Sequence, residues 1–415
     1  MNRKQLTIVL VLGIVVGAVA FSVLRKEKAS YQATDATKGD RVLPKFPLND
    51  VTHVRIKEVT NEVNIAKVED QWVVRERNNY PANFAEVSEF LRKVWELKPA
   101  ERITVGPSQL GRLHFNPPEK GGSNTATLVE FKDGSGKNLS ALTLGKKHVR
   151  ESQNASPFGG GEMPVGRYVM VSDTEPKVFL VSETFSSVEA QPAQWLNKDF
   201  FKVEKVRSVA VTTETNSWKV TRESESGEFK LADAKEGEQI DTGKASGLGW
   251  VLSSPSFNDV ATNIAPEVTG LDKPFLATIE TFDNFTYTIK VGKPTAGEDY
   301  YFAMDVAAKI DAERKAAADE KPEDKEKLDK EHKDKIAKLE EKLKTEKALS
   351  KHVYLVAKWT VEPLQKSRQD LLQEKKPETP APGATNAPPT LDPVPSPFPP
   401  PTPGAPAEAP KSDVK

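Results

Sequence analysis

The chain has 415 residues, enough for one to three domains, and 37% of them are hydrophobic, which is enough for real cores. Lys+Arg number 59 and Asp+Glu number 60, so the net charge of -1 gives no broad basic field and disfavours nucleic-acid binding. The absence of cysteine excludes disulfides, thiolate metal sites and cysteine nucleophiles.

The N-terminus carries the strongest local signal. Residues 6–24 form an uncharged, mainly apolar run, and a helix of this length roughly spans the ~30 Å hydrocarbon core of a bilayer. We predict a cytoplasmic stub at 1–5 and a transmembrane anchor at 6–24. Ala18-Val19-Ala20 also fits a signal-peptide cleavage site, so loss of residues 1–20 is the alternative. Either way, we expect the rest of the chain to lie outside the cytoplasm, behind a single span if the segment is not cleaved.

Residues 25–45 are polar and mixed in charge, and we predict a linker there. Two similar units then follow, at 46–200 and 201–375. The matching positions keep their order, and the register changes only at loops. They include Val54, Ile56 and Val63 against Val209, Val211 and Trp218, then Leu144-Gly145-Lys146 against Val291-Gly292-Lys293, and Val178-Phe179-Leu180-Val181 against Val353-Tyr354-Leu355-Val356.

Each unit is predicted to contain strands, one helix and further strands. Short stretches rich in β-branched residues predict strands at 51–57, 62–68 and 71–76. Asn83 and Glu86 resemble a capping box at the start of a helix over 83–97. Apolar residues recur there at helical spacing, so one face should be buried. These residues are Phe84, Val87, Phe90, Leu91, Val94 and Trp95.

Later strands are predicted at 125–132, 139–144, 167–172 and 177–182. Few helices separate the strands, so antiparallel pairing is favoured over a parallel doubly wound sheet. The predicted fold class is α+β, with two tandem repeats of a mostly antiparallel sheet packed with one helix, plus the N-terminal transmembrane helix.

The second unit carries a charged insertion at 305–351, dominated by Lys, Glu, Asp and Ala. Lys321-Pro322 interrupts its helical pattern, so we predict a protruding helical hairpin. It is either a contact arm for a partner or a solvated charged segment. The proline-rich tail at 376–415 should be extended and disordered, as a passive spacer or a binding tail.

No motif in the sequence marks a catalytic, cofactor-binding or metal-binding residue. The histidines lack metal-ligand spacing; they are His53, His114, His148, His332 and His352. Gly134-Ser135-Gly136-Lys137 lacks the first glycine and the final Ser/Thr of a phosphate loop, which favours a hairpin turn. A hidden carboxylate pair of a hydrolase stays open, but nothing in the sequence selects one. We therefore expect no enzymatic activity and no cofactor.

The tryptophans raise a choice between ligand stacking and core packing. Trp95 and Trp250 occupy equivalent positions on the predicted helices of the two units. Because both lie on the apolar stripe, we predict that they are buried. Trp72 and Trp218 lie in strand-like segments, where we predict packing as well.

Several motifs resemble the DUF4340-domain family of bacterial membrane-anchored proteins, over residues 46–374. They are Trp72-Val73-Val74, Tyr80-Pro81-Ala82-Asn83, Leu144-Gly145-Lys146, Tyr168, Val178-Phe179-Leu180-Val181 and Gly270-Leu271-Asp272-Lys273-Pro274. The sequence departs from the family at 113–118, where His114 replaces a glycine, and in its charged insertion and proline-rich tail.

The resemblance implies an extracytoplasmic protein without known enzymatic activity, whose relatives often accompany ABC-type transporter components and gliding-associated transport proteins. We expect an interaction or scaffold protein with a protein partner, for which components of an ABC transport system are candidates. The alternative is a module that binds an envelope glycan or small molecule between the two units. A hydrolase with cryptic carboxylates is the third hypothesis.

Overall fold

The computed structural model describes residues 31–35, 40–150, 163–172, 175–213, 216–314 and 322–374. The predicted stub, anchor and proline-rich tail lie outside these ranges. Among the described residues, no helix has the length and apolar character needed to cross a membrane.

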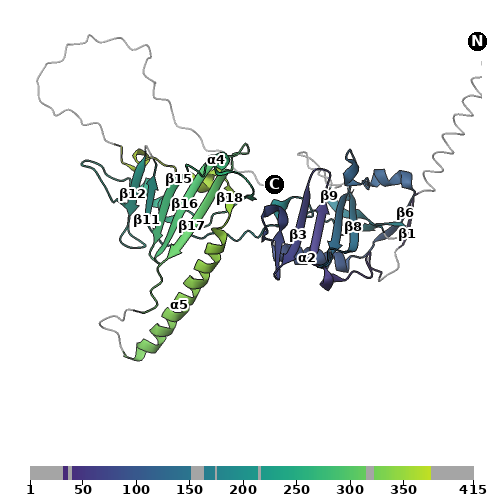
Figure 1. Ribbon diagram of the computed structural model, residues 1–415, viewed down its shortest axis with the longest axis horizontal. Coiled ribbons are helices and arrows are strands. Elements are labelled where there is room, and N and C mark those ends of the chain that lie inside the picture. Colours follow the sequence, from purple (N-terminus) through teal and green to yellow (C-terminus); the bar gives the residue numbers. More distant parts are fainter. Residues whose placement is uncertain are drawn as a thin grey trace, which may run out of the picture. The chain divides into compact units, whose positions relative to one another are not determined.

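The described chain is an α+β protein with two antiparallel sheets and a few helices (Figure 1). In the described residues the first sheet has ten strands, in the order β1-β6-β10-β9-β8-β7-β2-β3-β4-β5. Their bounds are β1 (Tyr31–Asp35), β2 (His53–Lys57), β3 (Glu62–Val68), β4 (Gln71–Val74), β5 (Tyr80–Pro81), β6 (Glu101–Val105), β7 (Thr127–Lys132), β8 (Asn138–Arg150), β9 (Met163–Ser172) and β10 (Pro176–Val181).

The second sheet has eight described strands, in the order β13-β12-β11-β15-β16-β17-β18-β14. They are β11 (Val206–Thr212), β12 (Ser217–Thr221), β13 (Lys230–Leu231), β14 (Asp259–Ala261), β15 (Phe275–Thr281), β16 (Phe285–Pro294), β17 (Tyr300–Ala308) and β18 (Val353–Val356). The described α-helices are α2 (Phe84–Glu96), α3 (Thr242–Ser246), α4 (Pro266–Thr269), α5 (Pro322–Leu349) and α6 (Lys358–Val361).

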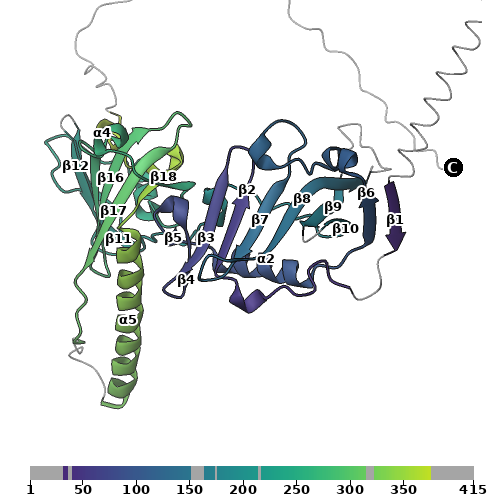
Figure 2. The ribbon, with the colours of Figure 1, turned by 45° about the vertical axis from the view of Figure 1, so that its right-hand side comes forward.

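Helix α2 packs on one face of the first sheet (Figure 2), as its apolar stripe predicts. Asn83 caps it, because its side chain accepts a hydrogen bond from the Glu86 amide at 3.3 Å. Val87, Phe90, Leu91 and Val94 are buried, and the Phe90 ring lies 6.0 Å from that of Phe131 in β7. Phe84 departs from the prediction: it opens the first turn and is 64% exposed.

The segment predicted as a linker is part of the fold where it is described. Residues 31–35 form β1, which pairs with β6 at the edge of the first sheet. Val42 and Leu43 are buried in the core, and the Val42 amide donates to the Leu97 carbonyl at 2.8 Å. Apolar side chains within a polar stretch are enough to join it to a nearby core.

The predicted hairpin turn at 133–137 is confirmed, since it joins β7 to β8. The Asp133 carboxylate accepts from the Ser135 and Lys137 amides at 2.9 and 3.0 Å, and Gly136 has a positive φ of 85°. The predicted helical hairpin is corrected. In its described part the insertion continues β17 to Ala308 and then contains one helix, α5.

Candidate functional site

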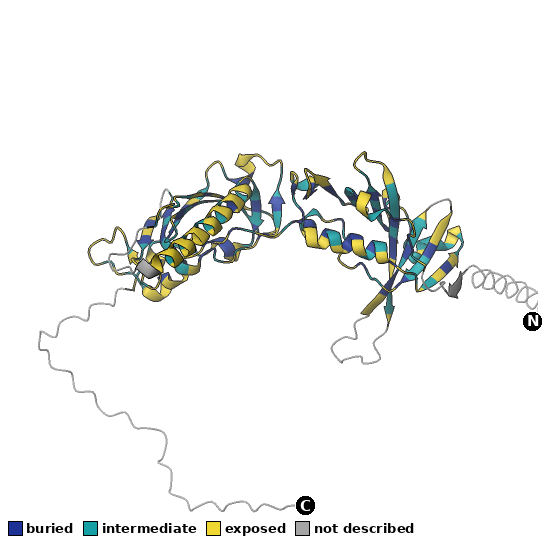
Figure 3. Cartoon of the chain, turned by 90° about the horizontal axis from the view of Figure 1, so that it is seen from below, coloured by how far each residue is buried: buried dark blue, intermediate teal, exposed yellow. Residues whose placement is uncertain are grey.

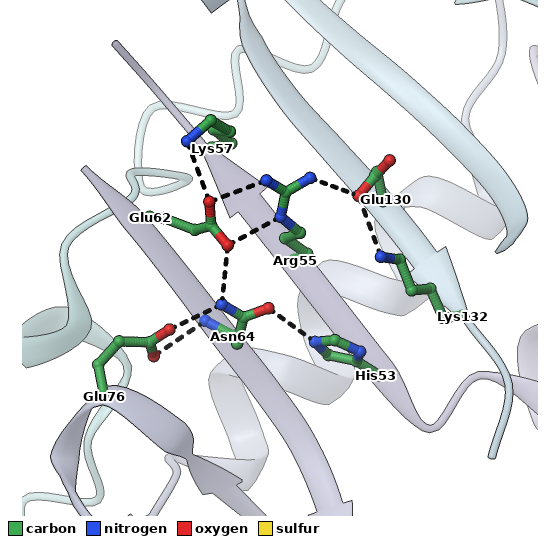
Figure 4. Close-up of polar contacts among 8 residues, drawn as sticks. All are labelled: His53, Arg55, Lys57, Glu62, Asn64, Glu76, Glu130 and Lys132. Carbon is green, nitrogen blue, oxygen red and sulfur yellow. Dashed lines mark hydrogen bonds and ion pairs between the residues drawn. The ribbon is translucent and has the colours of Figure 1, made fainter. Parts of the chain in front are cut away.

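A polar cluster covers the face of the first sheet opposite α2 (Figure 4). Side chains alternate along a strand, so β2 directs Val54 and Ile56 to the core and its other residues to the opposite face. The cluster is formed by His53, Arg55, Lys57, Glu62, Asn64, Glu76, Glu130 and Lys132.

Arg55 is the centre of this cluster. Its Nε and Nη2 donate to the two oxygens of Glu62 at 2.8 Å each, and its Nη1 donates to Glu130 at 2.9 Å. Hydrogen bonds from Arg55 hold the pKa of the Glu62 carboxyl well below its usual range. Burial raises the pKa of Glu130, but hydrogen bonds from Arg55 and Lys132 outweigh burial and lower it overall. Both carboxylates are therefore ionised at neutral pH.

The remaining members are also paired. His53 shares a hydrogen bond of 2.9 Å with Asn64, and Asn64 donates to Glu76 at 2.7 Å. Burial lowers the pKa of His53, so the ring is neutral at pH 7. The cluster holds three cations and three carboxylates, and these satisfy one another across neighbouring strands. Its arrangement fits stabilisation of the sheet, with no group left unpaired for catalysis.

No group of three or more His, Asp or Glu side chains in the described ranges could hold a metal ion. The histidines are scattered. His148 packs edge-on against Tyr168, and His352 against Tyr80. His114 ends the 3-10 helix η3 (Pro107–Leu113) with a positive φ of 60°, a conformation that favours glycine.

The tryptophans divide into a buried group and an exposed pair. Trp72, Trp195 and Trp218 are buried, and Trp95 is partly covered by the Arg41 guanidinium 4.0 Å above its ring. Trp250 is 77% exposed and Trp359, in α6, is 58% exposed. Large aromatic side chains are normally more buried than this, and exposed tryptophan is a common anchor of binding surfaces.

The exposure of Trp250 corrects the prediction that it packs in the core. In the first unit, α2 stays α-helical through Trp95. In the second unit, α3 ends at Ser246, and the 3-10 helix η6 (Gly247–Trp250) follows. Gly247 and Gly249 weaken the helix, and the tighter turn rotates the apolar stripe. Leu248, Val251 and Leu252 are buried in its place.

A shallow hollow of about 200 Å³ lies against the exposed pair. Trp250 and Trp359 line it together with Pro255, Thr360 and Pro363. Thr360 is only 4% exposed, and within the described structure its Oγ1 has no hydrogen-bond partner. Such a group normally finds a partner when it is buried. We call this surface, defined by Trp250, Trp359 and Thr360, the tryptophan surface.

A larger hollow of about 580 Å³, the α5 hollow, shares Trp250 with this surface. Helix α5 supplies Lys335, Lys338 and Leu339 to its lining. Figure 3 shows α5 as mostly exposed, with the N-terminal part extending away from the second sheet in Figure 1. Leu339, Leu343 and Leu349 pack against the core.

Glu346 anchors α5 to the second sheet. It is 3% exposed, and its two oxygens accept from the Tyr287 hydroxyl at 2.9 Å and the Lys202 amide at 3.0 Å. Lys342 lies 3.2 Å from the same carboxylate. Burial, with the Glu346 charge, raises the pKa of Tyr287 far above its usual value, so the hydroxyl keeps its proton and donates it. No pattern along the chain marks Glu346 as buried, because it lies in a run of lysine and glutamate.

The described chain is thus an α+β protein with two exposed tryptophans and a charged hollow against α5. The family model described as "Domain of unknown function (DUF4340)" matches residues 72–274. This match confirms the resemblance to the DUF4340 family that the sequence motifs predicted. No curated protein and no solved structure matches the chain.

Proposed function

We propose that the chain is a membrane-anchored envelope protein that binds a partner protein through its tryptophan surface. The apolar run at 6–24 would tether it to a bacterial inner membrane, with the two units on the periplasmic side. The resemblance noted from the sequence makes components of an ABC-type transport system the partners to test first.

We further propose that the two units are tandem copies of one module. The strand order β3-β2-β7-β8-β9-β10-β6 in the first sheet corresponds to β12-β11-β15-β16-β17-β18-β14 in the second. A Cβ atom on Gly145 in β8 would overlap the carbonyl oxygen of Leu113, and one on Gly292 in β16 would overlap that of Thr269. The residues after these carbonyls, His114 and Gly270, both have positive φ. A shared origin accounts for this correspondence of order and detail.

The exposed pair Trp250 and Trp359 is the observation that carries the binding function. The first unit keeps the equivalent Trp95 partly covered, whereas the second unit leaves Trp250 in solvent at a loss of burial energy. Tryptophan in a shallow hollow is the residue type that most often dominates a protein interface.

The test is crosslinking in intact membranes, followed by affinity purification and mass spectrometry. We expect the wild-type chain to recover a membrane protein at near-stoichiometric yield, and W250A/W359A to lose it. Phe84→Ala is the matched control, because Phe84 is an equally exposed aromatic residue on the first unit. It should keep the partner.

Two results would contradict the proposal. One is recovery of the chain alone after gentle crosslinking. The other is equal recovery of the same partner by the wild type, the double tryptophan variant and the Phe84 control. Urea unfolding of each variant checks that lost recovery does not come from lost folding, since surface substitutions of this kind should change stability by only about 0.5 kcal/mol.

A further inference from the structure

The α5 hollow has the size and lining of a small-molecule site. Its volume of about 580 Å³ lies within the roughly 300–1,000 Å³ typical of ligand pockets. Helix α5 supplies part of the lining, and η6 supplies Trp250 and Gly249. The charged insertion therefore builds the hollow, because the anchor at Glu346 holds α5 against the sheet.

Positive charge exceeds negative charge in the lining. Five cationic side chains face three carboxylates there. The cations are Lys202, Lys205, Arg222, Lys335 and Lys338, and the carboxylates are Glu204, Glu225 and Asp283. Asp283 forms ion pairs with two lysines, with Lys205 at 3.1 Å and with Lys335 at 2.8 Å. The hollow thus carries a net positive charge, which attracts an anionic ligand.

Arg222 and Lys338 are the least neutralised of these cations. Arg222 donates from Nε to the Val206 carbonyl at 2.7 Å and from Nη1 to the Glu225 carbonyl at 2.6 Å, and both acceptors are uncharged. Burial lowers the pKa of this guanidinium, as expected for a charge with little compensation. In the described chain, Lys338 has no ion pair. A bound carboxylate or phosphate would supply the missing negative charge.

Trp250 adds a flat apolar face at the rim of the same hollow. The C–H face of a sugar ring packs well on an exposed indole ring, while its charged substituents stay free for hydrogen bonds. Ser253 and Ser254 also line the hollow and can bond to hydroxyl groups. An aromatic face beside serines and lysines combines the three contacts that an acidic sugar makes.

We propose that the α5 hollow binds an anionic saccharide, whose ring stacks on Trp250 and whose carboxylate or phosphate is held by Arg222 and Lys338. This inference goes beyond docking of a protein partner, and the two sites share Trp250. It gives the charged insertion a role, since α5 supplies part of the lining and one of the two anion-binding cations. The chemistry fits an acidic glycan or a sugar phosphate equally, and the probes below separate them.

The test is calorimetric titration of the full-length chain in detergent micelles. The probes are trigalacturonate with neutral galactotriose, glucose 6-phosphate with glucose, and inorganic phosphate alone. We expect at least one acidic sugar to bind tenfold or more tightly than its neutral counterpart, with affinity falling as salt rises. Binding of trigalacturonate assigns a carboxylate ligand, and binding of glucose 6-phosphate alone assigns a phosphate ligand.

Single substitutions locate the site. Lys338→Gln and Trp250→Ala should each weaken the acidic probe at least threefold. Lys344→Gln is the matched control, because Lys344 is an exposed lysine on the same helix outside the hollow, and it should leave affinity unchanged. Trp359→Ala should also leave sugar binding intact, whereas Lys338→Gln should leave partner recovery intact. These two variants separate failure of this site from failure of the docking function.

Three outcomes would overturn the proposal. The first is that no acidic sugar binds, and the second is that neutral and acidic sugars bind alike. The third is that inorganic phosphate binds as tightly as glucose 6-phosphate, since the sugar ring would then contribute nothing. Binding that neither Lys338→Gln nor Trp250→Ala weakens would place the ligand elsewhere and would equally refute the site.

Discussion

Replacing Glu346 with alanine should release α5 from the second sheet. The substitution removes the acceptor of the Tyr287 hydroxyl, the Lys202 amide and the Lys342 ammonium together. Tyr287 is fully buried, so its hydroxyl cannot turn to solvent while the helix stays in place. Water can reach these groups only if the C-terminal half of α5 moves away.

The magnitude follows from the donors left behind. Each buried donor without an acceptor costs about 1–3 kcal/mol, so the hydroxyl and the amide together cost roughly 2–6 kcal/mol. We therefore expect docking of α5 to weaken by about 3–4 kcal/mol.

Hydrogen exchange of the α5 amides is the appropriate assay, because it detects local undocking as well as global unfolding. A loss of about 3 kcal/mol corresponds to roughly a hundredfold faster exchange, at 1.4 kcal/mol per factor of ten. Exchange in Glu346→Gln should be faster than in the wild type and slower than in Glu346→Ala. The glutamine side chain has one acceptor oxygen, so it can replace only one of the hydrogen bonds from the Tyr287 hydroxyl and the Lys202 amide. Glu341→Ala is the control, since Glu341 is an exposed acid on the same helix.

Unchanged protection of α5 in the alanine variant would refute this reasoning. So would a change in unfolding free energy no larger than that of the Glu341 control. In either case the apolar contacts of Leu339, Leu343 and Leu349 would be sufficient to hold the helix, and the buried carboxylate would contribute little.

Two further predictions concern acid stability and backbone strain. Because Arg55 lowers the pKa of Glu62 in the folded state, this carboxylate adds stability above its unfolded pKa of about 4.3, and that stability is lost as pH falls towards the folded pKa. Glu62→Gln should lower the unfolding free energy by about 1–2 kcal/mol at pH 7, measured by urea unfolding. The difference from wild type should be smaller at pH 3. A difference that stays constant with pH would contradict this prediction. His114→Gly should raise the unfolding free energy by about 0.5–1 kcal/mol, because it relieves a positive φ at some entropic cost. Gly270→Ala at the corresponding turn should lower it. A lower unfolding free energy for His114→Gly, or an unchanged or higher one for Gly270→Ala, would refute the equivalence of these turns.

Local sequence determined most of the secondary structure. Runs of β-branched residues predicted β2, β3, β4, β7, β8, β9 and β10, but not β1, β5 or β6, and β8 extends beyond its predicted end. Asn83 marked the start of α2. The turn at 133–137 followed from glycine and aspartate chemistry alone. These features depend on neighbours within a few positions along the chain, so a single sequence contains the information that sets them.

The tertiary structure decided the candidate sites. Whether Trp250 packs or is exposed depends on how α3 ends and on what covers it, and helical spacing could not tell the two tryptophans apart. The burial of Glu346 depends on Tyr287, 59 positions away along the chain. Val42 and Leu43 are likewise buried in the core. The polar composition around them had predicted a linker that ends at residue 45. Contacts between residues far apart in the sequence decide which side chains are buried. Burial in turn shifts the pKa of a polar group and decides whether it can reach a ligand. Periodicity along the chain does not specify these contacts.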